Sequence, residues 1–258
     1  MTALPTVTAQ LDAGSMNLRL ERASRKNAID SDMYVALTEL FGQARDNDSV
    51  RVVTLTAEGG TFCAGNDLAD FEPPEAFAPS SPAFAFMRTL ATFPKPLIAG
   101  VQGAAVGIGF TMLLHADILI AAEDAFFSAP FVDLGVCPEA ASTILLPQIT
   151  GLSRARDIFL TGRAVRADEA LRIGIANVVV PAKALAGAVQ EYARAIVGKP
   201  TAALAATKSL LLRSAVEMET VGRIDLEADV FCRLLRGPAT AEALASRREK
   251  RRPDFSTL

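Results

Sequence analysis

The sequence predicts an α/β fold, in which β-strands alternate with helices through most of the chain. Three patterns support this class. A hairpin pattern over residues 6–22 is followed by a helical pattern over 31–45 and a short β-branched run over 50–56. A second strand-like run begins at Pro96 and passes through four glycines into an apolar helical pattern. Further strand and helix patterns follow, which is the order expected of parallel strands joined by crossover helices.

The first elements are located by hydrophobic periodicity. Apolar residues alternate on both sides of Asp12-Ala-Gly14, which predicts two antiparallel strands with one buried face. Between Met33 and Ala44 they recur at helical spacing behind the capping pair Asp30-Ser31. The run Val50–Thr56 is short and rich in β-branched residues, so we expect a buried strand that a crossover places parallel to its neighbour.

Two loops are predicted before the second strand-like run. Residues 59–65 contain three glycines, and residues 71–82 contain four prolines and two serines. The proline-rich segment suits neither a helix interior nor a sheet, so we expect an exposed, mobile loop of the kind that acts as a lid. A short helix is expected over residues 83–92.

The chain is organised around residues 96–117. Glycines at positions 100, 103, 107 and 109 remove side chains where the backbone turns or is approached closely, which is the condition for using main-chain N–H groups as ligand donors. Beyond this stretch we expect a strand over 117–122, a segment over 125–130, and a loop through 135–139 that leads into a helix from Ala140.

The C-terminal part has a different character. Residues 183–198, 201–214, 220–235 and 239–250 are helical patterns rich in Ala, Leu and Glu. We therefore place a boundary near residue 195, which gives a core over residues 1–195 and a helical C-terminal region over 196–258.

Composition excludes several classes of protein. The net charge of −3 gives no field that favours nucleic acid. Three cysteines without paired spacing argue against a disulfide framework or a zinc site, and a single histidine excludes an imidazole metal centre. The first residues lack a leader pattern, and no run of eighteen apolar residues occurs, so we expect a cytoplasmic protein with no membrane partner.

Two glycine-containing turns are candidates for an oxyanion hole. Phe62-Cys-Ala-Gly-Asn-Asp-Leu68 and Gly107-Ile-Gly-Phe-Thr111 each lie where a strand or loop meets a helix, so each could aim a backbone N–H at the same point. Such a pair of donors stabilises negative charge on a carbonyl oxygen. The alternative is that glycine-rich turns serve only tight packing.

Seven segments then resemble, in order and spacing, the enoyl-CoA hydratase/isomerase (crotonase) superfamily. They are Ser24-Arg-Lys-Asn-Ala28, Phe62-Cys-Ala-Gly-Asn-Asp-Leu68, Lys95-Pro-Leu-Ile-Ala-Gly-Val-Gln-Gly103, Leu114-His-Ala-Asp117, Leu134-Gly-Val-Cys-Pro-Glu139, Leu160-Thr-Gly-Arg163 and Glu249-Lys-Arg-Arg-Pro-Asp-Phe255. The resemblance implies a crotonase-like spiral of ββα units whose C-terminal helices form a homotrimer or a dimer of trimers. It also implies that an acyl-CoA thioester is polarised by the amides of Asn66 and Ile108.

The acid/base residues decide between branches of the superfamily. The hydratase pattern has two glutamates where this chain has Thr111 and Phe131, neither of which can act as a general base near neutral pH. Instead, Pro138-Glu-Ala-Ala-Ser142 resembles the signature of the Δ3,Δ2-enoyl-CoA isomerase branch, which needs one carboxylate. The resemblance therefore implies that Glu139 moves a proton from C2 to C4 of the acyl chain. The alternative is that Glu139 is only a carboxylate at the N-terminus of a following helix, where its charge interacts favourably with the helix dipole.

Other residues are weaker candidates. We interpret Asp67 as the cap of a following helix, although it could bind a polar group. Asp133 is the acid that would replace Glu139 if the latter pointed away. His115 is interpreted as a satisfied core residue, and Cys63 lacks the base that a thiol nucleophile needs.

The resemblance also implies contacts with substrate. Lys250 and Phe255 match positions that contact the nucleotide of CoA in a neighbouring subunit, and Arg25 and Lys26 match a phosphate and adenine region. The full set of implied substrate and CoA contacts is Arg25, Lys26, Ala64, Asp67, Leu68, Thr111, Phe131, Lys250 and Phe255. No metal and no separate cofactor is implied, because CoA is part of the substrate.

Three functions follow as hypotheses. The leading one is a Δ3,Δ2-enoyl-CoA isomerase of lipid metabolism, in which Glu139 shuttles the proton. The second is an enoyl-CoA hydratase or another acyl-CoA enzyme that uses Asp133 or an unrecognised base. The third belongs to another class, a non-catalytic acyl-CoA binding subunit.

Overall fold

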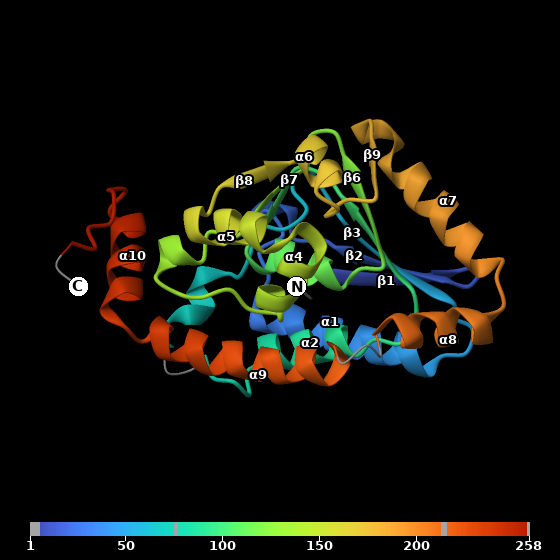
Figure 1. The fold of residues 1–258 in the computed structure, drawn as a ribbon, viewed down its shortest axis with the longest axis horizontal. Coiled ribbons are helices and arrows are strands. Elements are labelled where there is room, and N and C mark those ends of the chain that lie inside the picture. The colour runs from blue at the N-terminus through green and yellow to red at the C-terminus, as the bar shows by residue number, and fades with distance from the viewer. Residues whose placement is uncertain (1–5, 75–76, 213–215, 257–258) are drawn as a thin grey trace, which may run out of the picture.

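The computed structural model describes residues 6–74, 77–212 and 216–256, and it contains two sheets (Figure 1). The larger sheet has the strand order β1-β2-β3-β4-β6-β9, with β1 (Val7–Asp12), β2 (Ser15–Leu20), β3 (Val52–Ala57), β4 (Leu97–Val101), β6 (Ile118–Ala122) and β9 (Val178–Val180). Only β1 is antiparallel to its neighbour. The smaller sheet has the order β5-β7-β8, with β5 (Ala104–Val106), β7 (Phe126–Ser128) and β8 (Ala164–Arg166).

The predicted N-terminal hairpin is confirmed. Asp12 pairs with Ser15, and both residues between them have positive φ, 45° at Ala13 and 87° at Gly14. Two such residues form the kind of turn whose twist matches that of the flanking strands. Leu18 and Leu20 are fully buried on the inner face of β2.

The predicted crossover from the hairpin to the next strand is also confirmed. Helix α1 (Ser31–Asp46) begins after Asp30, whose carboxylate accepts a hydrogen bond of 3.0 Å from the Met33 amide. Its buried face carries Met33, Leu37 and Phe41, as the periodicity predicts. Strand β3 then runs parallel to β2, with Leu55 opposite Leu18.

Helices cover both faces of the larger sheet. In Figure 1, α1, α2 (Pro82–Ala91) and α9 (Val216–Leu235) lie below the sheet, and α7 (Leu185–Val197) lies at its other side. A separate apolar cluster that includes Val52, Ile98, Ile120 and Val189 fills the space under α7. The other α-helices in the described residues are α3 (Ile108–Thr111), α4 (Ser142–Thr150), α5 (Leu152–Thr161), α6 (Ala167–Arg172), α8 (Thr201–Leu212) and α10 (Pro238–Arg248).

The described part of the proline-rich segment is largely a loop, as predicted, and Glu72, Pro73 and Ser80 are exposed, but two of its phenylalanines are buried. Phe71 and Phe77 are 2% and 6% exposed, and their rings meet edge to face with centroids 5.1 Å apart. Phe231 of α9 packs against both rings, at 5.9 and 5.7 Å. The prolines exclude regular structure, but the aromatic side chains between them bury enough area to hold the segment in place. Residues 75–76 lie outside the described residues, and the helix predicted after them is confirmed as α2.

Two other predictions are corrected in detail. Residues 96–117 form two strands, β4 and β5, before the short helix α3, because Gly103 turns the chain from the larger sheet into the smaller one. A Cβ at Gly103 would lie 2.0 Å from the Gly60 carbonyl oxygen, and its φ is 57°. The helix expected from Ala140 begins at Ser142, since Ala140 and Ala141 have left-handed φ values of 60° and 55°.

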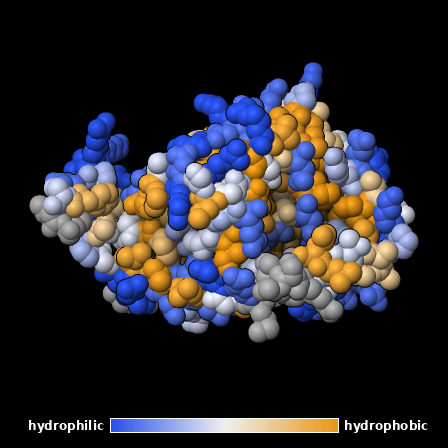
Figure 2. All heavy atoms as spheres, in the orientation of Figure 1, coloured by the Kyte–Doolittle hydropathy of each residue, from blue (hydrophilic) through white to orange (hydrophobic). Residues whose placement is uncertain are grey.

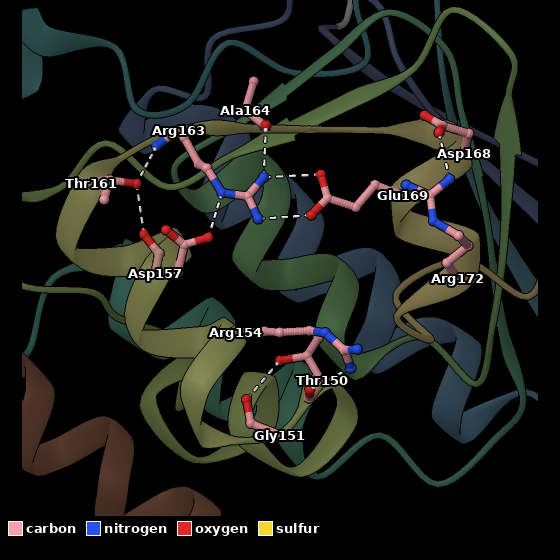
Figure 3. A network of polar contacts seen from close by, with 10 residues as sticks. All are labelled: Thr150, Gly151, Arg154, Asp157, Thr161, Arg163, Ala164, Asp168, Glu169 and Arg172. Carbon is pink, nitrogen blue, oxygen red and sulfur yellow. Dashed lines mark hydrogen bonds and ion pairs between the residues drawn. The ribbon is translucent and has the colours of Figure 1, made fainter.

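Residues 150–180, for which the sequence predicted no elements, are held by a polar network (Figure 3). Arg163 binds the Asp157 carboxylate of α5 at 2.6 Å and both oxygens of Glu169 of α6, at 2.7 and 2.9 Å. The hydrogen bonds to Glu169 and Asp157 raise the pKa of Arg163 above its ordinary value. Arg163, which lies in one of the quoted motifs, therefore has a structural role that joins α5, β8 and α6.

Beyond Val180 the described part of the chain contains helices and no strands. Lys208 of α8 anchors this part, since its ammonium donates to the Lys95 carbonyl at 2.8 Å and to Asp117 at 2.7 Å. The division into residues 1–195 and 196–258 stays a prediction. Within the described residues, no helix is both long enough and apolar enough to cross a membrane.

Candidate active site

The two glycine-containing turns lie side by side. Cys63 and Ala105 form a parallel bridge, in which the Cys63 amide donates to Ala104 at 3.0 Å and the Val106 amide donates to Cys63 at 2.9 Å. Parallel segments leave their ladder in the same direction. The Gly65-Asn66 and Gly107-Ile108 peptides therefore emerge next to each other.

Glycine is required where these turns approach each other. Gly65 has a φ of 104°, and a Cβ there would lie 3.1 Å from the Val106 carbonyl oxygen. Gly107 has a φ of 56°. At Gly109 a Cβ would lie 2.6 Å from the Cys63 carbonyl oxygen and 2.8 Å from the Cys63 Cβ, so only glycine lets α3 pack on the first turn.

The amides of Asn66 and Ile108 are placed as donors. Ile29 pairs with the residues on either side of Asn66. Its amide donates to the Gly65 carbonyl and its carbonyl accepts from the Asp67 amide, both at 2.8 Å, so the Asn66 amide is left out of this pairing. Ile108 is the first residue of α3, where an N–H has no acceptor within the helix. Within the described residues, neither amide has a protein acceptor.

Tyr34 fixes the side chain of Asn66. Its hydroxyl, carried by the buried face of α1, donates to the Asn66 Oδ1. Burial, followed by the nearby Glu139 carboxylate, raises the pKa of Tyr34 well above its ordinary value, so the hydroxyl keeps its proton. The sequence analysis missed Tyr34, whose only signal is a polar aromatic residue on an otherwise apolar helix face.

Glu139 is a buried carboxylate beside α3. It is 1% exposed, and its Oε1 accepts a hydrogen bond of 2.7 Å from the Thr111 hydroxyl. Its Oε2 is buried without a partner among the described residues. Burial raises the pKa of Glu139 to about 8, although the Thr111 hydroxyl opposes this and the charge of Glu227 adds to it.

Thr111 can serve both protonation states of Glu139. Its Oγ1 lies 2.7 Å from the Glu139 carboxylate and 3.2 Å from the Gly107 carbonyl oxygen. When Glu139 is ionised, the hydroxyl donates to it. When Glu139 is protonated, the hydroxyl can accept that proton's hydrogen bond and donate to Gly107.

The Glu139 side chain makes no hydrogen bond to the start of the following helix within the described residues. Helix α4 begins three residues later, at Ser142, and the Glu139 side chain bonds to α3 instead. Glu227 of α9 accepts from the amides of Ala141 and Thr143 at the start of α4, at 2.6 and 3.1 Å. The helix already has its N-terminal carboxylate.

A cavity of about 110 Å³ lies over the two turns. Of the residues predicted for the site, Ala64, Asn66, Leu68 and Phe131 line it. Ile108, Thr111 and Glu139 are buried and do not contribute to its lining. Gly65 and Gly107 of the two predicted turns also line it, as do Leu134 and Val136 of a quoted segment. The other lining residues were not singled out by the sequence analysis: Phe71, Val106, Pro130, Phe231 and Arg247.

Comparison with known proteins identifies the family. The family model for enoyl-CoA hydratase/isomerase matches residues 11–257. The chain belongs to this family. Curated relatives include a 1,2-epoxyphenylacetyl-CoA isomerase of Escherichia coli K12, 34% identical over 97% of this chain and 98% of the relative. A carnitinyl-CoA dehydratase of Salmonella arizonae is 38% identical over 76% of each chain.

The solved structures agree with this assignment. An enoyl-CoA hydratase/isomerase from Pseudoalteromonas atlantica T6c superposes with a TM-score of 0.93, at 32% identity, over 98% of this chain and all of the other. The predicted α/β crotonase fold with C-terminal helices is therefore confirmed. The protein is a crotonase-family acyl-CoA enzyme, of the isomerase or hydratase/dehydratase kind.

Both carboxylate oxygens of Asp67 are bound within the protein. Its Oδ1 accepts from the Ala69 amide at 3.2 Å, which confirms the capping prediction, and its Oδ2 binds Arg22 at 2.8 Å. Partial burial raises the pKa of Asp67, but the hydrogen bonds from Arg22 and Ala69 outweigh it and leave the pKa lower than usual. Arg22, which the sequence analysis missed, thereby ties the end of β2 to the first oxyanion turn.

The residues expected to contact CoA lie at the surface. Arg25 and Lys26 are exposed, and the Lys26 carbonyl accepts from the Ala64 amide at 3.0 Å, so this loop adjoins the first turn. Lys250 is exposed after α10, and Phe255 is 39% exposed. Their contacts with CoA stay predictions.

The weaker candidates are placed as follows. Asp133 is exposed, and its carboxylate faces Gly162 at the end of α5. His115 is partly buried, with its Nε2 2.8 Å from the Ala140 carbonyl oxygen, and burial lowers its pKa to about 4. Burial raises the pKa of Cys63 to about 12, so it is not a thiolate at neutral pH.

Proposed function

We propose that the protein is a Δ3,Δ2-enoyl-CoA isomerase. The observation that carries this proposal is Glu139, a buried carboxylate with one oxygen bound to Thr111 and the other without a partner among the described residues. It stands beside α3, whose first amide is one of the two candidate oxyanion donors. One base and one oxyanion hole are all that a shift of a double bond requires.

The reaction proceeds through a dienolate. The Glu139 Oε2 takes a proton from C2, the C2–H bond breaks, and its electron pair moves toward the thioester oxygen. The amides of Asn66 and Ile108 hold the negative charge that develops there. The Glu139 carboxyl group then returns the same proton to C4, a C4–H bond forms, and the double bond lies between C2 and C3.

The raised pKa suits this role. A pKa of about 8 makes Glu139 a stronger base than an ordinary carboxylate, and its acid form can return the proton. The Thr111 hydroxyl supports both forms, as described above. Phe71, Phe131 and Phe231 form apolar walls of the cavity and disfavour a bound water.

A hydratase or dehydratase is the second candidate, because curated relatives include carnitinyl-CoA dehydratases. The two-carboxylate route needs a second acid facing the same water. Asp133 is exposed with its carboxylate facing Gly162, and both oxygens of Glu227 already accept hydrogen bonds, from the amides of Ala141 and Thr143. The geometry therefore favours isomerisation.

We further propose that CoA lies across the surface formed by Arg25, Lys26 and the cavity-lining Arg247, with Lys250 and Phe255 serving a neighbouring subunit. Exposed leucines support an assembly of subunits, since Leu160, Leu210 and Leu211 are 71%, 69% and 75% exposed. Figure 2 shows hydrophobic patches between hydrophilic ones on the face of the molecule that it draws. We expect a homotrimer or a dimer of trimers, which light scattering coupled to gel filtration will measure.

The function is tested by incubating the protein with a 3-enoyl-CoA and following the conjugated 2-enoyl product. We expect turnover by the wild type, a fall of about 10³-fold for Glu139→Gln, and full activity for the control Asp133→Asn. A Glu139→Gln variant with the wild-type rate would refute the assigned role. Rapid hydration of crotonyl-CoA without isomerisation would favour the hydratase. Tight CoA binding without turnover of any enoyl substrate would favour a binding subunit.

A further inference from the structure

The turn that carries Glu139 has a backbone conformation that alanine does not favour. Ala140 and Ala141 are both left-handed, with φ of 60° and 55°, and both are fully buried. An L-residue with a Cβ is destabilised in this region, and two in succession persist only when their surroundings impose the conformation. Something other than local preference therefore holds the residues that follow Glu139.

Both polar groups of the Ala140–Ala141 peptide bond are held by ionisable side chains. The Ala141 amide donates to the Glu227 Oε2 at 2.6 Å. The Ala140 carbonyl accepts from the His115 Nε2 at 2.8 Å, which requires that this nitrogen carry the proton. His115 follows α3 in the chain, whereas Glu227 comes from α9, so the peptide is gripped from two separate elements.

Glu227 is the more extensively bound of the two. It is 5% exposed, and its Oε1 accepts from the Thr143 amide at 3.1 Å and from the Thr143 hydroxyl. A buried carboxylate is costly unless its oxygens are satisfied, and here each oxygen has a partner. Helix α9 is in turn fastened to α2, since Asp225 binds Arg88 at 2.6 Å.

The same helix forms part of the cavity wall. Phe231 follows Glu227 by four residues, which places both on one face of α9, and Phe231 lines the cavity. One rigid element thus contacts both the expected acyl site and the turn that carries Glu139.

We propose that Glu227 is a positioning residue, which holds the Ala140–Ala141 peptide in its left-handed form so that the Glu139 carboxylate stays bound to Thr111 beside α3. This rests on the proposed function, because it assumes that Glu139 is the base. His115 holds the opposite end of the same peptide. If an acyl chain that fits poorly displaced α9, the hydrogen bonds from Ala141 and Thr143 to Glu227 would be lost and the chemical step would be slower.

Glu227 also acts on Glu139 through its charge. The ionisable groups that interact with Glu139 come from several elements: Glu227 from α9, Cys137 from the same loop, Tyr34 from α1 and Cys63 from the first oxyanion turn. The tyrosine and both cysteines have raised pKa values and stay neutral, and so does His115, whose pKa is lowered to about 4. Burial raises the pKa of Glu227 as well, to about 7, and the charge of Glu227 is one of the causes that raise the pKa of Glu139.

The test compares Glu227→Ala, Glu227→Gln and the matched control Asp229→Asn, an exposed acid on the same helix. We expect Glu227→Ala to lower kcat by about 10²-fold with KM changed less than about 3-fold, because a displacement near 1 Å costs that much in rate. Glu227→Gln keeps an acceptor and should restore most of the rate. In the pH profile of kcat/KM for Glu227→Gln, the fall in activity on the acid side should move to lower pH, since the charge of Glu227 that raises the pKa of Glu139 is gone. The control should match the wild type.

A second measurement does not depend on activity. Hydrogen exchange followed by mass spectrometry should show faster exchange in the peptide that contains Ala141 and Thr143 for Glu227→Ala, and no change for Asp229→Asn. A wild type without isomerase activity would refute the proposed function alone, and exchange would then decide whether the turn is held. Unchanged exchange there, or a Glu227→Ala variant with the wild-type kcat and pH profile, would overturn the positioning role. If Glu227→Ala does not fold, an unmoved pH profile in Glu227→Gln overturns it.

Discussion

Gly109→Ala tests whether close packing of α3 on the first turn sets the oxyanion geometry. Gly109 is helical, so alanine can adopt its backbone conformation and the substitution acts through space alone. The added Cβ would lie 2.6 Å from the Cys63 carbonyl oxygen, whereas ordinary contacts begin at 3.4 Å. The two turns must therefore separate by about 0.8 Å.

Two consequences are expected from this separation. Overpacking of this kind costs about 1–3 kcal/mol of unfolding free energy, which lowers Tm by about 2–4 °C per kcal/mol. The Ile108 amide, directly before the substituted residue, moves with α3 relative to Asn66. We expect kcat to fall by about 10²-fold with a smaller change in KM, because the oxyanion forms only after binding.

The matched control is Gly42→Ala, within α1. A Cβ at Gly42 meets nothing within 4 Å, so alanine there should stabilise the helix by about 0.5–1 kcal/mol and leave kcat unchanged. Thermal unfolding and the isomerase assay measure both effects. A Gly109→Ala variant with the wild-type Tm and kcat would refute the link between packing and catalysis.

Three further predictions follow from buried side chains. Thr111→Val removes the hydrogen bond that lowers the pKa of Glu139, so the acid limb of kcat/KM should move to higher pH, and a limb that moves lower would contradict this. The pKa of Glu139 is raised from 4.5 to about 8 on folding, so its contribution to stability is lost as pH rises between these values. In urea unfolding, the free energy of unfolding of Glu139→Gln should not show this decrease between pH 4.5 and about 8. The same pH dependence in the variant and the wild type would argue against a raised pKa of Glu139. Phe231→Ala should cost about 3–5 kcal/mol in urea unfolding, and a cost below about 1 kcal/mol would contradict its place in the aromatic cluster.

The sequence predicted the elements whose signals are local. The hairpin, α1 with its Asp30 cap, and the alternation of strand and helix all follow from periodicity and capping. Its glycines also marked the two turns, and the family resemblance pointed to the amides of Asn66 and Ile108 within them. These features depend on neighbours in the chain.

The missed features depend on distant partners. The segment over residues 71–82 was expected to be an exposed loop because its prolines are visible in the sequence, whereas the packing of Phe71 and Phe77 against Phe231 is not. Tyr34, Arg22 and Glu227 gain their roles from contacts with residues 32, 45 and 86 positions away. No periodicity encodes such pairings. For Tyr34 and Glu227 the only indication is a polar residue on a buried helix face, and Arg22, which lies outside the helices, has none.

The contact between Glu227 and Ala141 spans 86 residues, which affects when the enzyme becomes active during synthesis. The residues of both sheets and Glu139 are synthesised before α9, since the last strand ends at Val180 and α9 begins at Val216. The turn is gripped only once α9 docks, so a chain truncated before this helix would carry the amides and the carboxylate without their final alignment. Catalytic competence would then report that the last third of the chain has folded onto the first two.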